Sequence, residues 1–383
     1  MRIGWVIHGH ERYGVRTATL AITDVARSLG VEPCFLCLGR GDFYDELSAD
    51  PDRRIELIAD KAPPPPRGGL LGKLLWPTTL PRYGKRLRDR LREAVGRYEC
   101  VALHLTRPTQ LWVVPPNLAT PRPPIFWEMP NVIASAVSAR WYRVACRRWA
   151  VRPLPNSAFT ERSLRGDLET HIIYPPVDVR RWDPKTVEPI DLAGVGVPGD
   201  AAVVAIAAQL KPVKGQRVLI EAFAGLSVNT TPPHLVIIGG GDAAYRQGLE
   251  ELVRRLGLND RVHFTGESNE VPRYFRAVDV VVNARTDPEP YGLTVVEAMS
   301  MGKPVVAHAL GGPSETVLDG QTGWLFPEPT PEALRAALQR AFDAQSRWPE
   351  IGDAGRRRAT DEYSYEAAEV RYRRALTRAG LSL

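Results

Sequence analysis

Apolar residues follow two alternating patterns along this chain. Short runs of β-branched and other apolar residues predict buried strands, and stretches with apolar residues every three or four positions, such as Thr17 to Leu29, predict helices. Alternation of the two is typical of parallel α/β layers. In the first half we expect strands at Arg2 to His8, Glu32 to Leu38, Ile55 to Ala59, Cys100 to Leu105, Pro124 to Trp127, Val151 to Pro155 and His171 to Tyr174.

A second series of the same kind follows a break in the pattern. The segment Tyr174 to Asp200 is rich in Pro, Gly and Asp, and it predicts an interdomain hinge at 179–200. Beyond it, helices are expected at Arg217 to Leu226 and Tyr245 to Leu256. The expected strands are Ala202 to Ala207, Leu235 to Ile238, Val262 to Thr265, Val278 to Ala284 and Pro304 to His308.

The length of 383 residues favours two domains. The predicted fold class is α/β, with two doubly wound, Rossmann-like domains that face each other across a cleft. We place these domains at 1–178 and 201–362. The last helix, about 363–383, has no strand after it and is free to pack back on the first domain. Ligands of such sheets bind beyond the carboxyl ends of the strands.

The composition is that of an ordinary soluble protein, with 44% hydrophobic and 25% charged residues. No run approaches the roughly 18 apolar residues of a membrane span, and the first residues lack the features of a signal peptide. The expected location is cytoplasmic. Four scattered cysteines argue against a disulfide framework. Cys34 and Cys37 fall on a predicted buried strand, where positions three apart point to opposite faces.

The net charge of +6 is concentrated in the first half, in Arg82 to Arg97 and Arg140 to Arg152. Each segment fits the solvated face of an amphipathic helix, and each also fits attraction to an anionic acceptor or an anionic membrane surface. Pro63 to Gly69 predicts a surface loop that leads into the apolar stretch Leu70 to Trp76. A nucleic-acid binder would rest on the charge alone, and we expect no nucleic-acid partner.

Two glutamates eight positions apart surround a glycine just after the predicted strand Val278 to Ala284. Glu289 falls in the loop before a probable helix, and Glu297 lies about one turn into that helix. The unpaired N–H groups at the helix start, on Gly292, Leu293 and Thr294, would form an anion site. The pattern indicates a sugar-diphosphate site, although an ordinary strand, loop and surface helix would produce it too.

Other loops after predicted strands carry charge or glycine. The segment Gln209 to Gly215 (QLKPVKG) places Lys214, together with Lys211, where a phosphate would lie. The loop around Gly240 (GGGD) allows close backbone approach to a ligand. Each segment alone also fits an ordinary basic or glycine-rich turn. Their order and spacing along the chain are the specific signal.

The segment Val278 to Phe326, with its E-x7-E, GGP-x-E and DG-x-TG motifs, resembles the retaining nucleotide-sugar glycosyltransferases of family 4, which have the GT-B fold. The resemblance extends back through Leu235 to Gly266 and Gln209 to Ala222, and it is weaker in the first half. It implies an acceptor-binding domain followed by a nucleotide-sugar-binding domain.

The resemblance also implies roles for single residues. Glu289 would contact the hydroxyls of the donor sugar, Glu297 the ribose of the nucleotide, and Lys214 the phosphate. Gly292, Leu293 and Thr294 would bind the diphosphate through their backbone N–H groups, with Gln209, Lys211 and Gly240 nearby. In the first half, Gly14 would approach donor or acceptor, and His104 would lie on a cleft-facing strand end among the catalytic residues. Without the resemblance, His104 fits a core histidine.

Three positions depart from the family pattern. Gln209 stands where the family usually has an arginine. Fewer positive charges would therefore contact the diphosphate, unless Lys211 reaches it. Tyr13 replaces one glycine of a pair in the N-terminal loop. Glu128 follows a strand where a histidine is common. With Glu11 and Tyr13, Glu128 makes up the expected acceptor side.

The reaction implied is a retaining transfer from a nucleotide-diphosphate sugar, UDP- or GDP-linked, in which the departing phosphate takes the acceptor's proton. We expect no separate cofactor, and no divalent metal because no D-x-D sequence follows an apolar strand. The favoured acceptor is a small molecule such as an aminocyclitol or another secondary metabolite. Alternatives are a lipid or polysaccharide acceptor at an anionic membrane surface, and a nucleotide-sugar epimerase or sugar phosphorylase of the same architecture.

Overall fold

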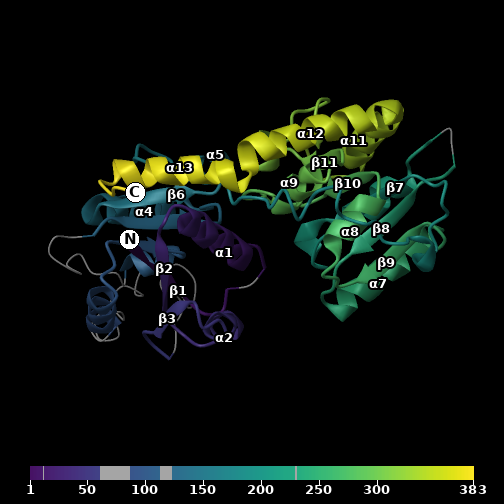
Figure 1. The fold of residues 1–383 in the computed structure, drawn as a ribbon. Helices are drawn as coiled ribbons and strands as arrows, with labels where there is room; N and C mark the ends of the chain where they lie inside the picture. The colour runs from purple at the N-terminus through teal and green to yellow at the C-terminus, as the bar shows by residue number, and fades with distance from the viewer. Residues whose placement is uncertain (12, 61–86, 113–122, 229–230) are drawn as a thin grey trace. The chain divides into compact units, whose positions relative to one another are not determined.

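The computed structural model describes residues 1–11, 13–60, 87–112, 123–228 and 231–383, and it divides the chain into two compact units (Figure 1). The first unit contains Met1–Pro176 together with Ala368–Leu383, and the second contains Val177–Ala367. The expected loop Pro63 to Gly69, the stretch Leu70 to Trp76 and the start of the first basic segment lie outside the described residues.

The first unit is built on a parallel sheet with strand order β3-β2-β1-β4-β5-β6. Its strands are β1 (Arg2–Ile7), β2 (Glu32–Cys37), β3 (Arg54–Leu57), β4 (Ala102–Leu105), β5 (Ile125–Met129) and β6 (Val151–Pro155). Its helices are α1 (Tyr13–Ser28), α2 (Asp42–Ser48), residues 87–97, η1 (Pro108–Trp112), α4 (Ala136–Trp149) and α5 (Ala158–Arg162). The strand order reverses between β1 and β4, which is where such sheets hold ligands.

Burial explains the apolar runs of this sheet. All but the first residue of β1 and of β2 are buried, as expected for parallel strands covered on both faces. Cys34 and Cys37 are both free and buried on β2. Burial raises the pKa of the Cys37 thiol, and Cys34 instead lies against Cys100 of a neighbouring segment.

One expected strand, His171 to Tyr174, is wrong. The segment runs beside β6, and its N–H groups at His171 and Ile173 donate to the carbonyls of Pro153 and Pro155. A parallel ladder also needs N–H groups donated in return. Pro153 and Pro155 have none, so the pairing stays one-sided.

The second unit has a parallel sheet with order β12-β11-β10-β7-β8-β9. Its strands are β7 (Val203–Ala207), β8 (His234–Ile238), β9 (Val262–Gly266), β10 (Val280–Asn283), β11 (Val305–His308) and β12 (Gly323–Phe326), of which β12 was not expected. Its helical elements are η2 (Ala193–Val195), η3 (Pro212–Lys214), α6 (Gln216–Ala224), α7 (Ala243–Arg255), α8 (Val271–Ala277), α9 (Leu293–Ser300), α10 (Pro313–Thr316), α11 (Pro331–Asp343), η4 (Gln345–Arg347) and α12 (Trp348–Tyr363). Helix α13 (Tyr365–Arg378) ends the chain, with all but its first three residues in the first unit. Two doubly wound, Rossmann-like domains are thereby confirmed.

Candidate functional site

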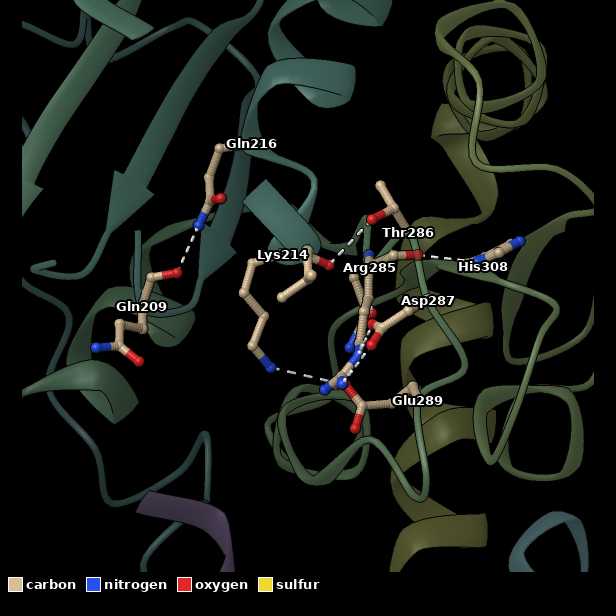
Figure 2. A network of polar contacts seen from close by, with 10 residues as sticks. Gln209, Lys214, Gln216, Arg285, Thr286, Asp287, Glu289 and His308 are labelled. Atoms are coloured by element: carbon tan, nitrogen blue, oxygen red, sulfur yellow. Dashed lines mark hydrogen bonds and ion pairs between the residues drawn. The ribbon is translucent and has the colours of Figure 1, made fainter. Parts of the chain in front are cut away.

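The candidate donor site of the second unit lies in loops that follow β7 and β10, which are neighbours in the sheet. Thr286, after β10, donates its backbone N–H to the carbonyl of Val213, after β7, over 3.0 Å. This bond joins two segments that are more than seventy positions apart in the sequence. It brings Lys214 beside the loop that carries Glu289 (Figure 2).

Lys214 points its ammonium toward Glu289, with Nζ 3.9 Å from Oε2 (Figure 2). The lysine side chain is 30% exposed and the glutamate side chain 14%. Burial lowers the pKa of the Lys214 ammonium, while the Glu289 carboxylate opposes that shift and the Arg285 guanidinium adds to it. The site therefore holds a partly desolvated cation, whose charge acts more strongly than it would in water.

The backbone of Glu289 is fixed by the loop after β11. Its N–H donates to the carbonyl of Leu310 over 3.1 Å, and its own carbonyl accepts from the N–H of Gly312 at 2.8 Å. Gly311 between them has φ +117°, and a Cβ there would overlap the Glu289 carbonyl. Only glycine allows the two loops to lie this close.

Arg285 and Asp287 are part of this site, although the sequence motifs did not single them out. The Arg285 guanidinium contacts Asp287 through Nε (2.5 Å) and Nη2 (3.2 Å), and Glu289 through Nη1 (3.2 Å). The His308 Nδ1 lies 2.9 Å from the Arg285 carbonyl and donates to it. An arginine directly after a buried strand and four positions before Glu289 was the available signal.

The N-terminus of α9 presents the expected backbone donors. Gly292 caps the helix with φ 88°, a left-handed conformation that favours glycine. The first N–H that bonds backward is that of Val295, to the Gly292 carbonyl over 2.9 Å. The N–H groups of Leu293 and Thr294 therefore have no acceptor within the helix, and the helix dipole adds positive potential there.

Glu297 lies in the same helix, one turn after Thr294. Burial raises the pKa of its carboxyl to about 7, and the positive charge of Arg181 opposes that shift. A carboxyl held in this state gains most from hydroxyl groups that donate to its charged form.

The remaining residues expected on the donor side lie around these groups. The carbonyl of Gln209 accepts from the buried Gln216 side chain over 3.0 Å, and Figure 2 shows Gln209 apart from the Arg285 cluster. Lys211 is exposed on the same loop. The carbonyl of Gly240 accepts from the N–H of Leu210 at 2.8 Å, so the glycine loop after β8 packs against the loop after β7.

His104 lies inside the first unit in a closed network. Its Nδ1 is 2.9 Å from Glu128 Oε1, its Nε2 is 2.8 Å from the hydroxyl of Tyr372, and its ring stacks on Trp5 at 4.5 Å. Trp5 Nε1 donates to the same Glu128 oxygen over 2.9 Å. The ring is fully buried with both nitrogens engaged. In this conformation His104 connects α13 to the sheet, and the catalytic role that the resemblance implied for it stays a prediction.

Glu11 lies at the reversal of strand order in the first unit, where polar groups are buried together. Its Oε1 accepts from the N–H of His8 over 2.8 Å and lies 3.6 Å from Arg107 Nε. Among the described residues, Glu11 Oε2, His8 Nε2 and Arg107 Nε have no hydrogen-bond partner. Burial lowers the pKa of His8 to about 4, so its ring is neutral.

Gly14 and Tyr13 open α1 beside this cluster. A Cβ at Gly14 would meet no atom within 4 Å, so the chain itself does not require glycine there. The side chain of Tyr13 lies outside what the structure describes.

One face of α4 is exposed and combines apolar with basic groups. Val137 is 60% exposed, and Trp141 and Val144 are 50% exposed. Arg140 and Arg148 are exposed on the same helix. Over the described residues, no helix is both long enough and apolar enough to cross a membrane.

Comparison with known proteins bears on both units. Residues 189–358 match the family described as Glycosyl transferases group 1. The chain is 30% identical over 197 residues to the D-inositol 3-phosphate glycosyltransferase of Streptomyces avermitilis, a match that covers 49% of this chain and 42% of that protein. It is 33% identical over 181 residues to the GDP-mannose-dependent alpha-(1-6)-phosphatidylinositol monomannoside mannosyltransferase of Mycolicibacterium smegmatis, covering 45% of this chain and 47% of that protein.

These matches span less than half the length of each relative. The fold likeness extends further. The crystal structure of Anabaena HepE in complex with UDP has a TM-score of 0.80 to this chain, with 22% identity, and the match covers 99% of this chain and 100% of that one. The second unit therefore carries a segment similar to the group 1 glycosyl transferases, and the chain as a whole shares its two-domain fold with a protein that binds UDP.

Proposed function

We propose that this chain is a retaining glycosyltransferase of the family 4 type, which moves a sugar from a nucleotide-diphosphate sugar to an acceptor hydroxyl. The observation that carries the proposal is the convergence of Lys214 and Glu289 beside the N-terminus of α9, within the segment similar to group 1 glycosyl transferases. A cation, a carboxylate and free backbone donors at one place suit a phosphate joined to a sugar.

Each group has a task in this proposal. Lys214 and the N–H groups of Leu293 and Thr294 bind the diphosphate, with Gly292 permitting close approach. Glu289 accepts hydrogen bonds from the hydroxyls of the transferred sugar. Glu297 accepts them from the ribose, whose two neighbouring hydroxyls match a carboxylate. UDP and GDP are the candidate carriers, because a structural neighbour binds UDP and a relative is named as GDP-mannose-dependent.

The bond between the sugar carbon and the β-phosphate oxygen breaks in the reaction, and a bond from that carbon to the acceptor oxygen forms on the same face. The acceptor's proton passes to the departing phosphate. Negative charge grows on that phosphate as the bond breaks, so Lys214 and the helix N-terminus stabilise the transition state more than the bound donor. No separate cofactor and no divalent metal take part in this proposal.

The proposed acceptor is a small polyhydroxylated ring, an aminocyclitol or a phosphorylated cyclitol. One relative is named for D-inositol 3-phosphate and another for phosphatidylinositol monomannoside, and both of these molecules contain a cyclitol ring. In the first unit, the buried carboxylate of Glu11 beside Arg107 suits hydroxyl or charged groups of such a ring, and Glu128 retains one oxygen outside the His104 network.

A lipid-linked acceptor is the second candidate, favoured by the exposed Val137, Trp141 and Val144 among arginines on α4. Such a face suits an anionic membrane surface. Binding to anionic vesicles that is lost in Trp141→Ser would support this candidate. Absence of vesicle binding would favour the small soluble acceptor.

Release of nucleoside diphosphate tests the proposed function. The wild-type chain is incubated with UDP-glucose or GDP-mannose, with and without a panel of inositol, inositol phosphates and aminocyclitols. Release that requires an acceptor, and a product with the donor's anomeric configuration, would support the proposal. Donor turnover without any acceptor would instead indicate an epimerase or phosphorylase, and an inverted product would exclude retention.

A further inference from the structure

We propose that Arg285 is a positioning residue of the donor site, which holds the Glu289 carboxylate in place for the sugar and neutralises the acids that surround Lys214. This inference rests on the proposed function. It assigns to Arg285 the charge that an arginine at position 209 would otherwise bring, since Gln209 is neutral and lies apart from the cluster (Figure 2).

Arg285 makes the shorter of the two cationic contacts with the Glu289 carboxylate. Its Nη1 is 3.2 Å from Glu289 Oε2, within hydrogen-bond range. Lys214 Nζ is 3.9 Å from the same oxygen, which is too long for a hydrogen bond. The orientation of the carboxylate therefore depends on the guanidinium.

Arg285 is itself held in place, its guanidinium by Asp287 and its backbone by neighbouring hydrogen bonds. Nε and Nη2 contact the two oxygens of Asp287, a bidentate pairing that fixes the plane of the guanidinium. The backbone carbonyl of Arg285 accepts a hydrogen bond from His308, which is buried and stacked on Phe326. The next residue, Thr286, donates to Val213. An arginine so constrained can orient a neighbour rather than merely attract it.

Charge balance gives Arg285 a second effect. The cluster contains two carboxylates, on Asp287 and Glu289, and two cations, on Lys214 and Arg285. Without Arg285, two negative charges would face one positive charge where a diphosphate must bind. Like charges in a partly desolvated site repel strongly. The positive charge of Arg285 offsets that repulsion, while its N–H groups stay hydrogen-bonded to Asp287 and Glu289.

This arrangement distinguishes Arg285 from an ordinary surface ion pair. Arg246 and Glu250 have the same spacing of four positions and a contact of 2.8 Å, but both side chains are 43% exposed. Arg285 is 20% exposed and Glu289 14%. An exposed pair contributes little, so Arg246 provides a matched control for substitutions at Arg285.

Arg285→Lys is the decisive variant, because lysine keeps the positive charge but cannot bridge Asp287 and Glu289 as a planar fork. We expect kcat for sugar transfer from UDP-glucose or GDP-mannose to fall by about 10- to 100-fold, the usual effect of misplacing a contact group. Binding of UDP or GDP, which lack the sugar, should stay within about threefold of wild type by calorimetry, because the charge balance is kept. Arg285→Ala should weaken both, and Arg246→Lys should change neither.

The outcomes separate the two proposals. If the wild-type chain neither binds nor turns over any donor of the panel, the proposed function fails, and the role of Arg285 fails with it. If the wild-type chain transfers sugar and Arg285→Lys matches it in kcat, only the role of Arg285 is overturned. A loss of nucleoside-diphosphate affinity as large as the loss of kcat would make Arg285 a phosphate ligand and overturn positioning. Thermal unfolding shows whether each variant is folded. Asp287→Asn weakens the bidentate contact that orients the Arg285 guanidinium, and it should also lower kcat more than the affinity for nucleoside diphosphate.

Discussion

The Lys214 ammonium lies 3.9 Å from one carboxylate oxygen of Glu289, Oε2. The two residues belong to loops that follow adjacent strands. Neither the lysine nor the glutamate belongs to a regular α-helix or strand, so their closeness depends on backbone bonds such as that from Thr286 to Val213. The pair is positioned by these backbone hydrogen bonds and is partly desolvated. These properties lead to the following predictions.

Substitution of Lys214 should damage catalysis more than stability. Lys214→Ala removes the cation expected to stabilise the departing phosphate, and kcat should fall by about 10²- to 10³-fold. The side chain makes no short hydrogen bond among the described residues, so thermal unfolding should change little. Lys185→Ala is the control, because this lysine is exposed and is not part of the candidate site, so a much smaller effect is expected. Equal losses in the two variants would contradict a specific role for Lys214.

Gly311 should be essential for placing Glu289. Gly311→Ala adds a Cβ that collides with the Glu289 carbonyl, at a φ of +117° that alanine adopts poorly. We expect loss of donor binding together with a lower melting temperature. Gly320→Ala is the matched control, since φ is +74° but no atom lies within 4 Å of the added Cβ. It should cost only about 1 kcal/mol of backbone strain and leave donor binding intact. Normal donor affinity in Gly311→Ala would refute the placement.

Donor affinity should depend on the charge of Glu297. The pKa of this carboxyl is raised to about 7, and ribose hydroxyls favour its charged form, so donor binding should release a proton near neutral pH. Affinity for a nucleotide sugar should fall as the pH drops from about 8 to about 6, approaching tenfold per pH unit below the pKa. Calorimetry in buffers of different ionisation enthalpy measures the released proton directly.

Glu297→Gln supplies the control for that linkage. Its donor affinity should be nearly independent of pH over the same range, and no proton should be released. Stability should change in a defined direction as well. The pKa of Glu297 is higher in the folded than in the unfolded protein, so the free energy of unfolding of the wild type falls as the pH rises through about 7. This free energy should fall less in Glu297→Gln. Proton release that persists in Glu297→Gln would assign it to another group.

Removal of His104 should destabilise the first unit. His104→Ala leaves the buried Tyr372 hydroxyl without its histidine partner and opens a cavity beside Trp5. The free energy of unfolding should fall by about 3 kcal/mol or more. Tyr372→Phe loses one hydrogen bond and should cost about 1 kcal/mol. Denaturant unfolding measures both. A stable His104→Ala protein without transfer activity would instead support the catalytic role that the resemblance implies for this histidine.

The repeated fold was predictable because parallel strands covered on both faces leave a strong sequence signal. Apolar runs such as Val151–Pro155 and His234–Ile238 are buried, and they appear where the pattern places them. The missed strand Gly323–Phe326 is short and starts with glycine. The false strand His171 to Tyr174 has the right composition, but its pairing fails because of two prolines on the neighbouring strand.

The site was only partly predictable for a related reason. Glu289, Gly292 and Glu297 carry a motif with fixed spacing, so a single sequence reveals them. Arg285 acts through contacts with Asp287 and Glu289 that depend on rotamers. His104 looks the same in sequence whether it faces a ligand or the core, and its partner Tyr372 lies 268 positions away. Such long-range pairing is set by packing rather than by local pattern.

The most direct test is calorimetric titration of UDP-glucose and GDP-mannose into the wild-type chain, into Lys214→Ala and into Glu289→Ala. We predict saturable binding of at least one donor to wild type, weakened in both variants, with free nucleoside diphosphate affected by Lys214→Ala but hardly by Glu289→Ala. Absence of binding to wild type, or equal affinity in all three proteins, would contradict the assignment of this site to a nucleotide-sugar donor.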